Sequence, residues 1–417
     1  MEKEISMSNL VNIKTDTNFA KPGEQSPLLK CLLQPKTDIE LFERLLAVGI
    51  SQTLSADEKN CIVASKLKKV IEWRTLLDNK FVDRLEDRKF CLLCLGHLIS
   101  AHYSGKAQSL GAIEWTLIRL SNAIADKKPI IFTFCFGGYK SHTSPSHPEV
   151  DWAELFNLNY LVSYLYPVIK GYQYGVEIEY ESEEVSIQFN NVPQEQTDRY
   201  TASFKKLLDY YTRKSLSKYG LNLTLRLVIA RGLYKEGVSK LYELMEEKKA
   251  KYRKIFDALL EGEKAKWIQR AASNYMWDNG IVKYANLSES ERYEIIKEAR
   301  INNEAFLEAD YDLRGSWFEY EYRIPLTGTW GRMPSAQPID GWLHLKSTAA
   351  SVVDCWIGTG FLETRDDNGI VEYRENILSK SQIESLEGEV TYIGSFDEEL
   401  KLISQNFNKI PVFIRKN

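Results

Sequence analysis

Polar and titratable side chains gather in one loop of this sequence, directly after an apolar run. Residues 129–136 are apolar almost throughout and predict a buried strand of a parallel sheet. Parallel α/β sheets bind ligands beyond the carboxyl ends of their strands. We therefore expect the chemistry of the chain at the loop that follows. It carries two glycines, an ammonium group, a hydroxyl group and two imidazoles, from Gly137, Gly138, Lys140, Ser141, His142 and His147.

The first half of this loop has the components of an anion-binding site. Glycines such as Gly137 and Gly138 let backbone N–H groups approach an oxyanion. Lys140 adds a positive charge and Ser141 a hydroxyl group. The spacing does not match the Walker A loop of nucleotide-binding proteins. A structural turn with an exposed lysine is the alternative interpretation.

Three arginines elsewhere are candidates for binding a phosphate or a carboxylate. Arg332 lies in a loop rich in glycine, proline and tryptophan, and a guanidinium group can hold either anion through two parallel hydrogen bonds. Arg226 and Arg231 flank the end of a predicted strand at 221–229 and are secondary candidates.

The second half of the loop and the helix after it supply candidate acids and bases. His147 is a candidate general acid or base, or a residue that packs the loop. Asp151 and Glu154 lie three residues apart at a helix N-terminus and so share one face. The helix dipole stabilises carboxylates there without any catalytic role. Glu154 lies one turn deeper and is expected to point back toward Gly137.

A metal site is an alternative use of the same loop. His147 and Glu149 form a His-x-Glu pair, which can begin a site of two histidines and one carboxylate. The second histidine would have to be His142 or the distant His344. The favoured interpretation includes no metal.

A second metal-like pattern lies earlier in the chain. Cys91, Cys94 and His97 are spaced as in a zinc fragment, but no second cysteine pair follows at a suitable distance. The surrounding segment is apolar and helical. We therefore interpret these cysteines as small buried core residues.

Composition narrows the class of protein. The chain has 417 residues, enough for two or three domains. A net charge of −4 provides no general attraction to nucleic acid, and no apolar run is long enough to span a membrane. Six scattered cysteines and an N-terminus without the apolar region of a signal peptide favour a cytoplasmic protein.

Changes of pattern along the chain predict five sections. A flexible lead-in (1–36) precedes a helical section (37–125). An α/β core with the active-site loop (126–232) follows, and then a helical insertion (233–313). A β-rich C-terminal part (314–417) is expected to complete the pocket.

Strands and helices alternate within the predicted core, which indicates an α/β fold with a Rossmann-like sheet. A Ser-x-x-Glu capping box from Ser146 to Glu149 predicts the start of the first core helix. The later elements are strands at 176–180, 185–189 and 221–229 and a helix at 194–211.

The order of these motifs resembles the isocyanide (isonitrile) synthase family, of the pyoverdine/paerucumarin and dityrosine-pathway type, as a divergent member. The similarity covers about residues 128–210. It rests on a strand leading to a lysine–serine pair, a proline with two carboxylates, a leucine-rich helix and a second strand. The motifs are Phe136…Lys140-Ser141, Pro148…Asp151-x-x-Glu154, Tyr174-Gly175-Val176-Glu177-Ile178 and Asn191-Val192-Pro193…Thr197-Asp198-x-Tyr200.

The resemblance implies a biosynthetic enzyme that condenses the amine of an amino acid with a sugar phosphate like ribulose 5-phosphate to form an isonitrile. It implies no metal and no nicotinamide cofactor. Lys140, Glu154 and His147 would be catalytic, with Lys140 alternatively forming a Schiff base with the sugar ketone. The sugar phosphate would be bound by Gly137, Gly138, Ser141, His142 and Arg332.

Two other functions remain open at this point. One is a metal-dependent hydrolase or oxygenase that uses His142, His147 and Glu149. The other is a non-enzymatic binding protein whose helical sections carry partner surfaces. The sequence leaves the amino acid, the oligomeric state and the pathway open.

Overall fold

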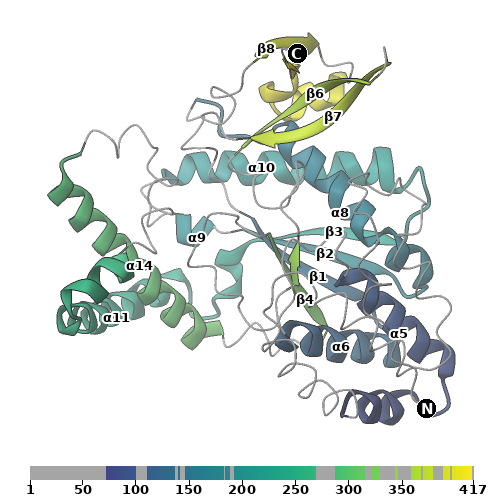
Figure 1. Ribbon diagram of the computed structural model, residues 1–417, viewed down its shortest axis with the longest axis horizontal. Helices are drawn as coiled ribbons and strands as arrows, with labels where there is room; N and C mark the ends of the chain where they lie inside the picture. The colour runs from purple at the N-terminus through teal and green to yellow at the C-terminus, as the bar shows by residue number, and fades with distance from the viewer. Residues whose placement is uncertain are drawn as a thin grey trace, which may run out of the picture.

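The chain is described here from a computed structural model (Figure 1). The structure describes residues 72–99, 110–136, 140, 146–182, 184–187, 192–268, 287–314, 322–328, 343–345, 358–367, 370–378, 388–394 and 397–415. The predicted lead-in, residues 1–36, lies outside this part of the chain.

A parallel five-stranded sheet forms the centre of the fold. The strand order across the sheet is β3-β2-β1-β4-β5. The first three strands follow one another toward one edge of the sheet, and β4 and β5 are then added on the opposite side of β1. The strand order therefore reverses between β1 and β4, which is where doubly wound sheets bind ligands. The strands are β1 (Ile130–Phe136), β2 (Val176–Ser182), β3 (Leu223–Val228), β4 (Arg323–Gly328) and β5 (Leu343–Leu345).

Helices pack against this sheet around one main core. Phe204 of α10 meets Tyr180 of β2 edge-on, with ring centroids 5.1 Å apart, and Tyr180 meets Phe134 of β1 in the same way at 6.0 Å. All three side chains are buried. The helices of this core are α5 (Leu85–Leu98), α6 (Leu110–Ala125), α8 (Trp152–Gly171) and α10 (Gln194–Tyr211).

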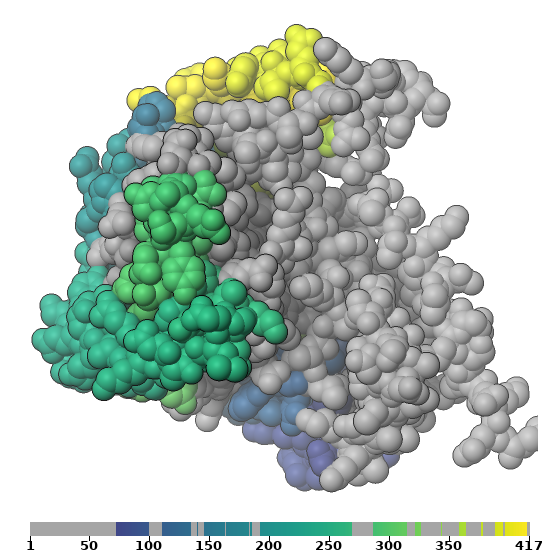
Figure 2. All heavy atoms as spheres, turned by 60° about the vertical axis from the view of Figure 1, so that its left-hand side comes forward, coloured from purple at the N-terminus to yellow at the C-terminus, as the bar shows by residue number. Residues whose placement is uncertain are grey.

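Two long helices form a separate unit. α11 (Val238–Ala258) and α14 (Glu289–Arg314) pack together through Leu241, Met245, Ala305 and Ala309. Figures 1 and 2 show them side by side, away from the C-terminal strands. Both helices fall in the section predicted to be a helical insertion.

A second sheet lies near the C-terminus, at the top of Figure 1. Its order is β7-β6-β9-β8; β6 pairs with β9 in parallel, and the other pairs are antiparallel. The expected α/β fold with a parallel core and a β-rich C-terminal part is thus confirmed. The strands are β6 (Thr359–Asp367), β7 (Ile370–Leu378), β8 (Gly388–Gly394) and β9 (Lys409–Arg415), with helix α16 (Glu398–Ile403) before β9.

The predicted strand at 185–189 is wrong. Glu184–Ile187 is instead a short helix, α9. Strand β2 is already paired on both sides, with β1 and with β3, so no free edge remained for a hairpin partner. Val185 is buried against Ala230 and Tyr234.

Candidate functional site

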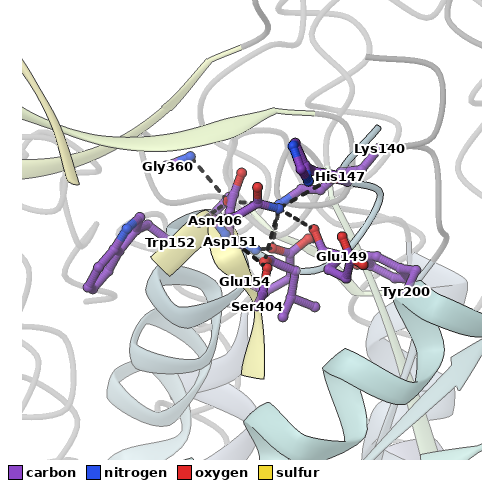
Figure 3. Close-up of polar contacts among 12 residues, drawn as sticks. Lys140, His147, Glu149, Asp151, Trp152, Glu154, Tyr200, Gly360, Ser404 and Asn406 are labelled. Carbon is purple, nitrogen blue, oxygen red and sulfur yellow. Dashed lines mark hydrogen bonds and ion pairs between the residues drawn. The ribbon is translucent and has the colours of Figure 1, made fainter. Parts of the chain in front are cut away.

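A buried ion cluster lies just beyond the carboxyl end of β1. The ammonium group of Lys140 is 2.7 Å from Asp151 Oδ1 and 2.5 Å from Glu154 Oε2. The Lys140 residue is 2% exposed and Glu154 1% exposed. Figure 3 shows the three side chains converging. The cluster therefore stands at the strand end where the sequence predicted chemistry, beside the point where the strand order reverses.

The start of helix α8 holds both carboxylates in place. Asp151 is the N-cap, and its Oδ1 accepts a hydrogen bond from the Ala153 N–H at 2.6 Å. The Asp151 N–H in turn donates to Glu154 Oε2 at 2.8 Å, which completes a capping box. The same two side chains that cap the helix bind the Lys140 ammonium group. Helix formation therefore positions both carboxylates for Lys140.

The capping box predicted from Ser146 to Glu149 is wrong by five residues. Residues 146–149 and residues 151–154 both have a capping residue followed three positions later by glutamate. Glu149, however, binds another residue: its Oε1 accepts hydrogen bonds from Arg199 Nε at 2.9 Å and from Arg199 Nη2 at 2.5 Å. The Asn406 side chain also donates to the Glu149 carbonyl at 2.9 Å and to the Val150 carbonyl at 3.4 Å. These contacts hold the segment before Asp151 outside the helix.

Tyr200 of α10 completes the cluster from the opposite side. Its hydroxyl group donates to Glu154 Oε1 at 3.0 Å, and the residue is 1% exposed. Ser203, one turn further along α10, accepts a hydrogen bond from the Val150 N–H at 3.1 Å. The sequence analysis did not select Tyr200 as a site residue, although it lies in a motif that carried the family resemblance.

Burial brings the pKa of Glu154 into the neutral range. Burial raises the pKa of Glu154 to about 7; Lys140 lowers this pKa and Asp151 raises it. Burial alone would lower the pKa of Lys140, but Asp151 and Glu154 outweigh that effect and raise it. Lys140 is therefore an ammonium ion, and Glu154 can gain or lose a proton near neutral pH.

The C-terminal sheet reaches the cluster through its first strand. The Gly360 N–H is 3.4 Å from Asp151 Oδ1. A Cβ atom on Gly360 would lie 2.3 Å from the Ala153 nitrogen, so only glycine permits this approach. The Trp152 indole N–H also donates to the Lys409 carbonyl at 2.9 Å. Strands β6 and β9 thus pack directly on the first turn of α8 (Figure 3).

The structure brings together two of the three predicted catalytic residues, Lys140 and Glu154. The third, His147, is exposed, and its carbonyl accepts a hydrogen bond from Asn406 at 3.3 Å. Its acid or base role stays a prediction. The predicted substrate-binding residues lie outside the described part of the chain: Gly137, Gly138, Ser141, His142 and Arg332.

The secondary phosphate candidates are paired with carboxylates. Arg226 lies 3.0 Å from Glu177 and 3.4 Å from Glu179, and Arg231 lies 3.7 Å from Glu184. These carboxylates neutralise the positive charges that would otherwise attract a phosphate.

The cysteine pattern of α5 belongs to the core, as predicted. Cys91 and Cys94 are buried, and burial raises the pKa of the Cys91 thiol to about 12. His97 Nε2 bonds to the Tyr164 carbonyl of α8. In the described residues, no group of three or more His, Cys, Asp and Glu side chains is arranged to hold a metal ion.

A second buried ion cluster lies at the end of β2. Arg314, the last residue of α14, bonds to Asp310 through Nε at 2.6 Å and through Nη2 at 2.7 Å. Its Nη1 donates to Glu181 of β2 at 2.7 Å. The Tyr234 hydroxyl group donates to Asp310 Oδ1 at 2.6 Å. This cluster ties the long helices to the central sheet.

Comparisons with known proteins include a distant structural similarity. No known protein-family model matches the chain, and no curated protein matches it. The crystal structure of the PvcA protein from Pseudomonas aeruginosa is similar, with a TM-score of 0.46 and 14% sequence identity. The similarity covers 73% of this chain and 92% of that one.

None of the helices in the described part of the chain combines the necessary length with sufficient apolarity to cross a bilayer.

Proposed function

We propose that this chain is a small-molecule biosynthetic enzyme of the isonitrile synthase type, in which Glu154 moves protons. The observation that carries the proposal is the buried cluster of Lys140, Asp151 and Glu154 at the end of β1. The sequence motifs that resemble the isonitrile synthases include all three residues. The substrates implied by that resemblance are an amino acid and a sugar phosphate like ribulose 5-phosphate.

The first reaction step needs a group that both accepts and donates a proton. The amine nitrogen attacks the ketone carbon, which forms a C–N bond and transfers the amine proton to the carbonyl oxygen. The resulting hydroxyl group then takes a second proton and leaves as water, and the iminium ion that remains loses its N–H proton to give an imine. A carboxyl group with a pKa of about 7, such as Glu154, can perform these transfers at neutral pH.

Lys140 has a different role in this proposal. A lysine that attacks a ketone must first be neutral. The two carboxylates around Lys140 instead raise its pKa and stabilise the ammonium form. We therefore assign Lys140 to holding Glu154 and Asp151 in place, rather than to a Schiff base of its own. The phosphate would be bound by the predicted residues Gly137, Gly138, Ser141, His142 and Arg332.

Product analysis tests this proposal. Purified protein is incubated with ribulose 5-phosphate and each proteinogenic amino acid, and mass spectrometry follows the loss of sugar phosphate and the appearance of an isonitrile. We expect one amino acid, or a few related ones, to be converted. Glu154→Gln should abolish most of this conversion, while Glu181→Gln in the second cluster should retain it. Absence of conversion by the folded parent protein would contradict the proposal.

Metal analysis separates this proposal from the metal-dependent alternative. That alternative requires Glu149, whose carboxylate already binds Arg199 in this structure. Elemental analysis of the purified protein and of His147→Ala checks it. A stoichiometric metal that disappears in His147→Ala would favour the alternative.

A further inference from the structure

The two oxygens of the Glu154 carboxylate have different partners. Lys140 and the Asp151 N–H both bind Oε2, at 2.5 Å and 2.8 Å. In the described part of the chain, the donor to Oε1 is the Tyr200 hydroxyl group, at 3.0 Å. Tyr200 comes from α10, whereas the other two donors come from the loop after β1 and from the start of α8.

Aromatic packing fixes the direction of the Tyr200 side chain. Its ring stacks on Phe204, with centroids 6.3 Å apart and planes within 15°. Phe204 in turn packs edge-on against Tyr180 of the central sheet. Tyr200 and Phe204 are both buried, so the ring has little freedom to turn away from Glu154.

We infer that Tyr200 lowers the proton affinity of Glu154 by donating a hydrogen bond to its carboxylate form. A donor of this kind stabilises the charged form of a carboxyl group and so favours loss of its proton. Tyr200 is a positioning residue here, because it acts on Glu154. Its importance for catalysis rests on the proposed function, whereas its effect on Glu154 titration does not.

The other charged groups around Glu154 belong to neighbouring elements. Lys140 faces it from the loop after β1, and Asp151 from the first turn of its own helix. The β6 strand contributes the Gly360 N–H, which faces Asp151. Replacing the Tyr200 hydroxyl group removes the hydrogen bond that Oε1 accepts at 3.0 Å.

The test is a direct titration of Glu154 in Tyr200→Phe. Protein labelled with ¹³C at the glutamate carboxyl carbon is followed by NMR from pH 4 to 9, and the signal missing in Glu154→Gln identifies Glu154. We expect its pKa to rise by about one unit, a tenfold increase in proton affinity, because a hydrogen bond to a charged group is lost.

Tyr211→Phe provides the matched control. The Tyr211 hydroxyl group also connects α10 to α8, through Asn159 Oδ1 at 2.8 Å, but it does not contact Glu154. This change should leave the Glu154 pKa unaltered. An equal shift in both variants would indicate general loosening of the helices and would overturn the inference.

A second variant keeps the test decisive if Tyr200→Phe does not fold. Replacement of Tyr200 by 3-fluorotyrosine retains the ring and makes the hydroxyl group a stronger donor, so the Glu154 pKa should fall. A titration unchanged from that of the parent, in either Tyr200 variant, would contradict the inference. The measurement uses no substrate, so failure of the isonitrile assay would leave its outcome intact.

Discussion

Two buried clusters at the same edge of the central sheet have matching components and different properties. Each combines one cation, two carboxylates and one tyrosine. They lie close in the fold, because the ends of β1 and β2 are paired in register. The first cluster contains Lys140, Asp151, Glu154 and Tyr200, and the second contains Arg314, Asp310, Glu181 and Tyr234.

The two clusters differ in their cation and in the burial of a carboxyl group. The planar guanidinium group of Arg314 binds Asp310 and Glu181 through fixed N–H directions and does not lose its proton in proteins. That cluster is suited to joining α14 to β2. The Lys140 cluster instead includes Glu154, a carboxyl group whose pKa burial raises to about 7. Similar sets of residues thus give one structural connection and one group that exchanges a proton.

The largest effect should come from removing the titrating group of the first cluster. Glu154→Gln should lower kcat/KM for isonitrile formation by about 10²–10⁴-fold, the usual contribution of a general acid or base. The measurement is steady-state kinetics on the protein with its identified amino acid. Glu181→Gln, the corresponding change in the second cluster, should retain near-parental turnover. Equal losses in both variants would show that the two clusters do not differ in this way.

Removing the first cation should strongly destabilise the fold. Lys140→Met leaves two carboxylates buried without a cation, which should lower the free energy of unfolding by about 3–5 kcal/mol at pH 8. The loss should be smaller at pH 5.5, because Glu154 can then be protonated. Urea denaturation at the two pH values checks both expectations.

Lys248→Met is a control for that experiment. Lys248 also lies between two carboxylates, Glu308 at 2.8 Å and Asp312 at 2.7 Å, but on the solvent-exposed side of the long helices. Its removal should have a much smaller effect. If the two lysine variants lose the same stability, burial is not what distinguishes Lys140.

Replacing the second cation by lysine tests the geometry of the guanidinium group. Arg314→Lys keeps the charge but cannot reproduce the two bonds to Asp310 together with the bond to Glu181. We expect a loss of about 1–3 kcal/mol and faster amide hydrogen exchange in α14 than in α10. Unchanged exchange in α14 would show that the Arg314 cluster does not hold this helix on the sheet.

The pH dependence of stability should originate in the first cluster. The pKa of Glu154 is raised from 4.5 to about 7 in the folded state, so the folded state binds more protons than the unfolded state between these values. Stability should therefore fall as pH rises from about 4.5 to 7, by about 1–3 kcal/mol. The measurement is the unfolding free energy of the parent minus that of Glu154→Gln at each pH. This difference should decrease as pH rises from about 4.5 to 7. An increase of this difference with pH would contradict the expected direction of the pH dependence.

Much of the central sheet could be predicted from the sequence. The apolar run at β1 and the alternating residues of β2 specify buried and half-buried strands, and the 194–211 helix matches α10 exactly in its bounds. The expectation that Glu154 points toward the segment after β1 followed from two local rules: polar residues at a strand end, and carboxylates near the N-terminus of the next helix. Both rules depend on neighbouring residues only.

The missed parts of the site depend on contacts between distant segments. Tyr200 lies 46 residues from Glu154, and Gly360 lies 209 residues from Asp151. Periodicity within α10 predicts that Tyr200 is buried, but not which group its hydroxyl group meets. Two neighbouring Ser/Asp-x-x-Glu patterns, at 146–149 and 151–154, also could not be ranked, because the choice between them depends on Asn406 and Arg199.

The close approach of Gly360 to the first turn of α8 has a consequence for synthesis of the chain. The ribosome makes β1, Lys140 and α8 long before it makes residue 360 and Asn406. During that interval Asp151 lacks the nearby Gly360 N–H of β6. The carbonyl groups of His147, Glu149 and Val150 also lack the hydrogen bonds that the Asn406 amide donates. A nascent chain that ends before β6 therefore carries the ionisable groups without the backbone that encloses them. Final assembly of the cluster therefore requires synthesis of the chain through Asn406.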